Sequence, residues 1–343
     1  MWWIWLVCIL GALLLLFLLV CLLIALLNKK LFGVRGKDPD NPCYLHIEDY
    51  PELKREDYET QCEGKAIRGY VYSLKEEANP KGFIVLAHGF FGSHVQYLVD
   101  IDFLCKQGYR VLAFDQYGVG MSDGESQVSL AHGILCLNEV IKDVEKRNLQ
   151  GDLPILLYGH SWGAYCCAGA LKDHPEISKA VLRSGPTSPE RAAFDLIWLN
   201  AKPLGVLLAP FFPLASLLVL GKKKLVNVTS SLEKNQTTQC LLLQAKNDKM
   251  VAYSHSLASY FLKHPQSNVS VFLTEEGGHN TIITEEGTAN YQKAVKEWDS
   301  FKKIENEEER EKKQEEFLAS LHRVPMYPYN ETTTNEIVRF LSK

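Results

Sequence analysis

The sequence predicts an α/β protein built on a doubly wound, mostly parallel sheet. Continuous apolar runs of strand length recur along the chain, and such runs are typical of strands buried on both faces. Helical patterns at 95–107 and 128–147 separate the early runs and are long enough for right-handed crossovers between parallel strands. Residues 58–61 and 67–74 flank a turn and predict an antiparallel hairpin at the sheet edge. The predicted buried strands are 82–87, 110–114, 154–158, 180–183, 240–245 and 269–273.

The N-terminal segment has the pattern of a membrane anchor. Residues 1–28 contain no charged side chain, and the apolar stretch 2–27 is long enough to cross a hydrocarbon core of about 30 Å as a helix. A cleaved signal peptide is the alternative, but it would need a basic N-terminal region, a shorter apolar stretch and a small-residue cleavage site. We therefore expect one transmembrane anchor at 1–28, followed by a juxtamembrane linker at 29–57.

Charge and cysteine usage predict the side of the membrane. Basic side chains flank the anchor only on its C-terminal side, at positions 29, 30, 35 and 37, so the positive-inside rule places the rest of the chain in the cytoplasm. The nine cysteines show neither ligand spacing nor a disulfide framework, which fits a reducing compartment. Sequons for N-glycosylation would matter only if the domain faced a secretory lumen. They lie at Asn227, Asn235, Asn268 and Asn330.

Composition limits the classes of function. The 343 residues are 46% hydrophobic, which is enough for a full core. A formal net charge of −4 offers no basic surface for nucleic acid, so no nucleic-acid partner is expected. No residue pattern indicates a metal or a bound cofactor. Small-molecule chemistry beside a membrane, or a protein partner, remains.

Residues that carry chemistry follow the predicted strands at their carboxyl ends, where ligands bind to sheets of this class. Ser161 lies in the sequence GHSWG, directly after the run 154–158 and before a helical segment. A G-x-S-x-G turn in that place holds the serine oxygen above the sheet. Asp248 and His279 follow later strands, and serine, acid, histidine is the chain order in which that arrangement recruits its acid and its base.

With these motifs in this order, the segment from about residue 58 to the C-terminus resembles the α/β-hydrolases, and it is most similar to the monoacylglycerol lipase and serine aminopeptidase-like branch. The resemblance implies the α/β-hydrolase fold with an inserted helical cap. One departure is Ala245, which stands where the acid-bearing loop of the family often has glycine. The matching segments are HGFFGSH at 88–94, FDQYGVGMSDG at 114–124, GHSWG at 159–163, AKNDKMV at 245–251 and GGHN at 277–280.

The resemblance implies a catalytic triad and an oxyanion hole. Ser161 would be the nucleophile, His279 would take its proton, and Asp248 would hold the imidazole in the required tautomer. The backbone N–H groups of Phe90 and Trp162 would stabilise the oxyanion. The expected product of the first step is an acyl-enzyme, which water then hydrolyses.

Structural roles are the alternatives for the same side chains. Ser161 could be an ordinary turn serine, His279 a buried histidine at a strand end, and Asp248 the N-cap of a helix. For His88 and Asp115 we expect structural roles, in which they order the loops that follow their strands.

The hydrolase core is predicted in two parts that are separated by a cap. Between residues 197 and 220 the chain is strongly apolar, with Lys202 as its one charged side chain and with interrupting prolines. A second membrane span is the alternative, but it would separate Ser161 from the later site residues unless the chain crossed back. The predicted divisions are the first core part at 58–185, the cap at 186–238, and the second core part at 239–343 with a charged helical extension at 286–322 and a final apolar helix face at 337–341.

The function expected from these features is a membrane-anchored serine hydrolase that cleaves carboxylic esters of lipid-like substrates. An acyl-thioesterase would use the same triad. A serine aminopeptidase would need carboxylates for the substrate ammonium, and the cap offers Glu190, Asp195 and Glu233. The alternative from another class is a membrane-tethered interaction protein with an inactive hydrolase scaffold.

Overall fold

A computed structural model describes residues 2–90, 92–200, 206 and 208–343, and in this part of the chain an eight-stranded sheet forms the centre of the molecule. The strand order is β1-β2-β4-β3-β5-β6-β7-β8. Strands β1 and β2 form an antiparallel hairpin, β2 pairs antiparallel with β4, and all remaining pairs are parallel. The strands are β1 (Leu53–Cys62), β2 (Lys65–Leu74), β3 (Gly82–Ala87), β4 (Tyr109–Phe114), β5 (Ile155–His160), β6 (Lys179–Arg183), β7 (Gln239–Ala245) and β8 (Val269–Thr274).

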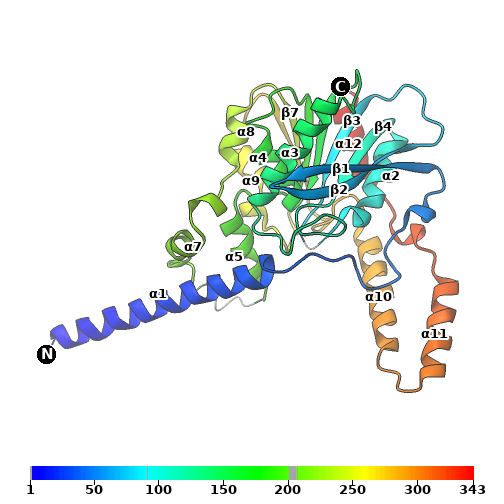
Figure 1. Ribbon diagram of the computed structural model, residues 1–343. Helices are drawn as coiled ribbons and strands as arrows, with labels where there is room; N and C mark the ends of the chain where they lie inside the picture. The colour runs from blue at the N-terminus through cyan, green and yellow to red at the C-terminus, as the bar shows by residue number, and fades with distance from the viewer. Residues whose placement is uncertain (1, 91, 201–205, 207) are drawn as a thin grey trace.

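Helices cover both faces of the sheet, as the doubly wound prediction requires (Figure 1). Alternation along β3 divides the core: Phe83 and Val85 join one buried cluster, whereas Ile84 and Leu86 join the other. The first cluster includes residues of α3 (His132–Arg147), α4 (Trp162–Ala170), α8 (Thr229–Lys234) and α9 (Leu257–Lys263), and the second includes residues of α2 (Leu98–Lys106) and α12 (Glu331–Leu341).

The predicted elements differ from the observed ones mainly at their ends. Strand β1 begins at Leu53, earlier than the predicted 58, because a regular ladder pairs it with β2 along its whole length. The connection predicted as a linker at 29–57 is therefore shorter. Helix α1 (Trp2–Phe32) continues into its beginning, and strand β1 takes up its end. The predicted helix at 95–107 begins as a 3-10 turn at His94–Tyr97 and becomes α-helical in α2.

Helix α1 is 31 residues long, so it extends about 46 Å and is longer than a hydrocarbon core. Its N-terminal part projects away from the domain, and its C-terminal part lies beside the cap (Figure 1). Among the described residues it is the helix that is long and apolar enough to cross a membrane. After α1, the Arg35 guanidinium donates hydrogen bonds to the carbonyl oxygens of Gly120, Ser122 and Gly124, which fixes the end of the helix to the domain.

The cap is helical and packs on α1. It contains α5 (Pro189–Asn200) and α7 (Phe212–Leu220), followed by α8. Val20 and Ile24 of α1 are buried together with Phe212 and Ala215 of α7. The apolar segment 197–220, for which a second membrane span was the alternative, is therefore interrupted by a turn before α7. Lys202, which was part of that prediction, lies outside the described residues.

The charged C-terminal extension forms two helices, α10 (Glu285–Phe301) and α11 (Glu307–Ser320), which pair as a hairpin that projects from the domain (Figure 1). The charged segment at 286–322 is therefore helical, but it is divided into two helices by a turn. Asn306 caps α11 by accepting the N–H of Glu309, and Phe301 packs against Phe317 between the two helices.

Candidate active site

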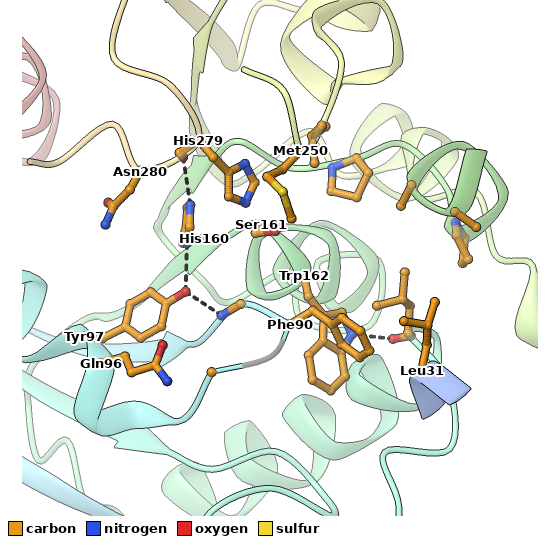
Figure 2. Close-up of a pocket in the computed structure, with 18 of the residues that line it drawn as sticks. Leu31, Phe90, Gln96, Tyr97, His160, Ser161, Trp162, Met250, His279 and Asn280 are labelled. Atoms are coloured by element: carbon orange, nitrogen blue, oxygen red, sulfur yellow. Dashed lines mark hydrogen bonds between the residues drawn. The ribbon is translucent and has the colours of Figure 1, made fainter. Parts of the chain in front are cut away.

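Three sheet strands bring the predicted catalytic side chains to one edge. Ser161 follows β5, Asp248 follows β7, and His279 follows β8. His279 Nδ1 lies 2.9 Å from Asp248 Oδ2. Ser161 and His279 line the same pocket, with Phe90 and Trp162 in its wall (Figure 2). The structure thus brings together the five residues that the sequence pattern singled out, from four segments spread between positions 90 and 279.

Ser161 occupies a strained turn between β5 and α4. Its backbone has φ 56° and ψ −117°, a combination that costs a non-glycine residue energy. The turn is tight because helix and sheet touch: a Cβ on Gly163 would collide with the Ala87 carbonyl oxygen, and one on Gly159 would lie 2.6 Å from the Ala164 nitrogen. Both glycines are therefore needed for close packing at this turn, and the turn holds Ser161 in the wall of the pocket.

Trp162 is the first residue of α4, so its backbone N–H has no partner within the helix. Its indole nitrogen donates to the Leu130 carbonyl oxygen at 2.8 Å, which fixes the ring. The positive end of the α4 dipole lies at the same place, where it favours negative charge.

Asp248 uses both carboxylate oxygens, although no helix begins at it. Its Oδ1 accepts the N–H groups of Met250 and Val251 within the loop after β7. Its Oδ2 accepts from His279 and from the Gln244 amide. Burial raises the pKa of this carboxyl, but the bonds from His279 and the two backbone N–H groups outweigh that effect and leave the pKa below its usual value. The ionised carboxylate holds the proton on His279 Nδ1, which leaves Nε2 as a base.

A hydrogen-bonded chain beside Ser161 and His279 was not predicted. His160 Nε2 lies 3.0 Å from the His279 carbonyl oxygen, an acceptor, so Nε2 carries the proton. His160 Nδ1 therefore accepts from the Tyr97 hydroxyl at 2.8 Å, and that hydroxyl accepts the Gly89 N–H at 2.7 Å (Figure 2). Burial, with the positive charge of Arg183 and the nearby His279, lowers the pKa of His160 well below its usual value, so its ring is neutral.

This chain connects the loop after β3, which carries Gly89 and Phe90, to the loop that carries His279. His160 stands in the GHSWG motif, so its place beside the nucleophile could have been read from the sequence. Tyr97 gave no such signal, because it lies in a turn that reaches the site only through the fold.

His88 and Asp115 have the structural roles that the sequence predicted. His88 Nδ1 donates to the Gly89 carbonyl oxygen at 2.8 Å, and its Nε2 accepts the Gln116 N–H at 2.9 Å. Burial lowers the pKa of His88, in agreement with an accepting Nε2. Asp115 accepts from the N–H groups of His94 and Met121, which orders the turns after β3 and β4.

The pocket has a volume of about 300 Å³, at the lower end of the usual range for small-molecule sites. Among its described lining residues, the one carboxylate is Asp100, which pairs with the buried Arg183 and accepts the Tyr158 hydroxyl.

The cap carboxylates lie elsewhere. Asp195 accepts hydrogen bonds from His255 and from the Ala252 N–H, and Glu233 accepts one from the Tyr260 hydroxyl. Glu190 does not line this pocket.

A possible metal-ligand group lies outside this pocket. Ligand atoms of Glu145, His174 and Glu176 lie within 4.8 Å of one another, and His174 already forms an ion pair with Glu176. Both glutamates are exposed.

Part of the chain is similar in sequence to known hydrolases. Residues 78–236 match the family model of the S33 serine aminopeptidases. The proline iminopeptidase of Saccharolobus solfataricus is 35% identical over 121 residues, which are 34% of this chain and 37% of that protein. The monoglyceride lipase homolog of Monkeypox virus is 26% identical over 150 residues, which are 43% of this chain and 54% of that protein. The chain thus spans about a third to a half of the length of these curated relatives.

Among solved structures, an esterase of Pyrococcus furiosus superposes with a TM-score of 0.55 at 22% identity, covering 78% of this chain and 95% of the esterase. This match, the mostly parallel sheet and the family match agree with the fold that the sequence predicted. The chain has the α/β-hydrolase fold, and its residues 78–236 resemble the S33 serine aminopeptidases.

Proposed function

We propose that this protein is a membrane-anchored serine hydrolase that cleaves carboxylic esters of lipid-like substrates. The observation that carries the proposal is that His279, which is hydrogen-bonded to Asp248, lines the same pocket as Ser161. Ser161 is held there by a strained turn. A serine hydroxyl is a poor nucleophile near neutral pH and needs a base of this kind.

In the proposed reaction, His279 takes the proton from Ser161 as its oxygen attacks the ester carbonyl. Asp248 stabilises the imidazolium that forms. The N–H groups of Trp162 and Phe90 receive the oxyanion, and donors of this kind are each worth about 10²- to 10³-fold in rate. His279 then protonates the departing alcohol, and the acyl-enzyme is hydrolysed by water that the same base activates.

The pocket favours an ester over a peptide with a free amino end. A substrate ammonium needs an available carboxylate within the pocket. Asp100 is already neutralised by Arg183. Asp195 and Glu233 are engaged within the cap, and Glu190 lines a neighbouring cavity instead. The lining is otherwise largely apolar, which suits acyl chains. The likeness to a viral monoglyceride lipase homolog supports the same choice. A thioester would react through the same residues.

Helix α1 supports the membrane part of the proposal. Its N-terminal side chains are exposed over the whole circumference, Trp2, Trp3 and Trp5 among them, as expected for a helix whose surroundings are lipid. Lys29 and Lys30 in the last turn of α1 support a cytoplasmic position for the catalytic domain, since basic residues gather on the cytoplasmic flank of a membrane span.

The first test is labelling of the full-length protein in detergent with a fluorophosphonate probe. Wild type should react, and Ser161→Ala and His279→Ala should not. Ser267→Ala and His322→Ala are matched controls, because both side chains are exposed and lie outside the site; these variants should label like wild type. Absence of labelling in folded wild-type protein would overturn the hydrolase proposal and favour an inactive scaffold.

A further inference from the structure

A second cavity adjoins the Ser161 pocket. Its volume is about 560 Å³, and it lies between α1, α5 and α7. Five residues line both cavities, so the two spaces are adjacent and these shared residues form the boundary between them. These shared residues are Leu31, Phe32, Leu130, Pro189 and Ala193.

The membrane-length helix itself forms one side of this second cavity. Leu23, Ile24 and Leu27 of α1 line it, opposite Phe212 and Ser216 of α7. The opposite face of the same helix points away from the domain, where Leu18, Leu22 and Leu26 are more than half exposed. One face of α1 therefore lines the cavity, while the other is available to lipid.

The end of α1 leads from this cavity to the nucleophile. Leu31 lines both cavities and lies beside Phe90 and Trp162 (Figure 2). The Phe32 ring packs against the Phe90 ring, with centroids 5.0 Å apart. Because Arg35 fastens the chain directly after α1 to the domain, this arrangement is a fixed part of the fold.

We propose that the second cavity is the acyl-chain subsite, and that the ester substrate is a long-chain lipid whose chain lies between α1 and the cap helices. This inference rests on the proposed function and adds the substrate class and the part played by the anchor. The lining is mostly apolar. Its uncharged polar members are Asn28, Ser129 and Ser216, and its charged members are Lys30, Glu190 and Lys224. Each methylene moved from water into such a space strengthens binding about fourfold.

The arrangement gives α1 a role in specificity besides attachment. A lipid in the membrane would contact the exposed face of α1. The second cavity lies along the opposite face of the same helix, at the same level of the membrane. A short ester fills only the Ser161 pocket and gains nothing from α1, whereas a long acyl chain uses both spaces.

A covalent probe tests the path directly. A long-chain alkyl fluorophosphonate with a diazirine at the chain end reacts with Ser161, with fluoride as the leaving group. Illumination then crosslinks the chain end, and mass spectrometry identifies the crosslinked peptide. We expect crosslinks to 23–32 of α1 and to α7. Labelling of Ser161 with crosslinks only to other elements would overturn this inference and leave the hydrolase proposal intact, whereas absence of Ser161 labelling would overturn both.

A pair of neighbouring substitutions provides the second test. Ser216→Phe fills the cavity, because Ser216 is buried in its wall, and Leu217→Phe is the control, because Leu217 is 46% exposed on the outer side of α7. The ratio of kcat/KM for a palmitoyl ester to that for a butyryl ester should fall at least about tenfold in Ser216→Phe. It should not change in Leu217→Phe. An equal ratio in both variants would contradict an acyl subsite here, and the crosslinking result decides the question if Ser216→Phe does not fold.

Discussion

At the scale of single residues, Asp248 shows why a capping pattern and a catalytic pattern could not be separated in the sequence. The motif Asn247-Asp248 is typical of a helix start, but no helix begins there, and one carboxylate oxygen accepts the N–H groups of Met250 and Val251 within a loop. The other oxygen binds His279 and Gln244, which belong to other segments. A sequence-based choice between the two was unnecessary, because a carboxylate has acceptor sites for both.

The substitution Asp248→Asn separates the two roles. The asparagine carbonyl still accepts from Met250 and Val251, so the fold should remain. Its amide group presents hydrogens to His279 Nδ1 and Gln244, which favours the wrong imidazole tautomer, and kcat on a butyryl ester should fall by about 10⁴-fold. Steady-state kinetics and a thermal melt check both parts. A loss of less than tenfold with an unchanged melt would remove Asp248 from the triad.

Tyr97 is expected to position the site without touching the substrate's reacting atoms. In Tyr97→Phe, the Gly89 N–H and His160 Nδ1 lose their shared partner, and each buried group left unsatisfied costs about 1–3 kcal/mol. We expect kcat to fall about tenfold or more with little change in KM, because the loops carrying Phe90 and His279 lose their connection.

The matched control is Tyr165→Phe. The Tyr165 hydroxyl is also buried, and it donates to the Val226 carbonyl oxygen at 2.8 Å, but it lies outside the pocket. This variant should lose stability without losing kcat. If kcat falls equally in the two variants at matched stability, then Tyr97 acts only through the stability of the fold.

At the scale of elements, the strands were predictable because burial on both faces leaves a continuous apolar run. The prediction 82–87 coincides with β3, and the other parallel strands differ from their predictions by one or two residues. The C-terminal hairpin was not predictable in the same way. Its charges are spread evenly, and the contact of Phe301 with Phe317 joins residues that only the turn between the helices brings together.

That contact predicts the local stability of the hairpin. Phe317→Ala should remove most of the packing between α10 and α11 and cost about 3–5 kcal/mol of local stability. Leu318→Ala is the control, because Leu318 is 42% exposed on the same helix. Hydrogen exchange should accelerate in both helices for the first variant only. Equal exchange rates in the two variants would show that the aromatic cluster does not hold the hairpin together.

At the scale of the whole molecule, helix α1 and the α/β domain form one unit. Val20 and Ile24 of α1 are buried against the cap, and Arg35 fixes the following segment. The sequence indicated the anchor and the cap separately, because each is apolar by itself. Their mutual packing was not predictable, since an apolar helix pattern does not specify its partner.

The position of the glycosylation sequons bears on the side of the membrane. Asn235 and Asn268 are buried, and their amide groups donate to backbone carbonyl oxygens. Neither side chain can carry a glycan in this fold. The absence of glycans at these two sites would therefore be uninformative. Asn227 is exposed in the loop before α8, and a further sequon on a different exposed loop gives an independent measure of the topology.

Such a sequon can be placed between β2 and β3. Glu76→Asn combined with Ala78→Thr creates one at exposed positions. Because the positive-inside rule places this loop in the cytoplasm, the variant should show no shift on glycosidase treatment when expressed in eukaryotic cells. The control carries the same tripeptide on a glycine-serine extension before Met1, which should be glycosylated. A shift in the loop variant, with none in the extension, would reverse the topology, and it would place the ester site and its acyl cavity on the luminal side of the membrane.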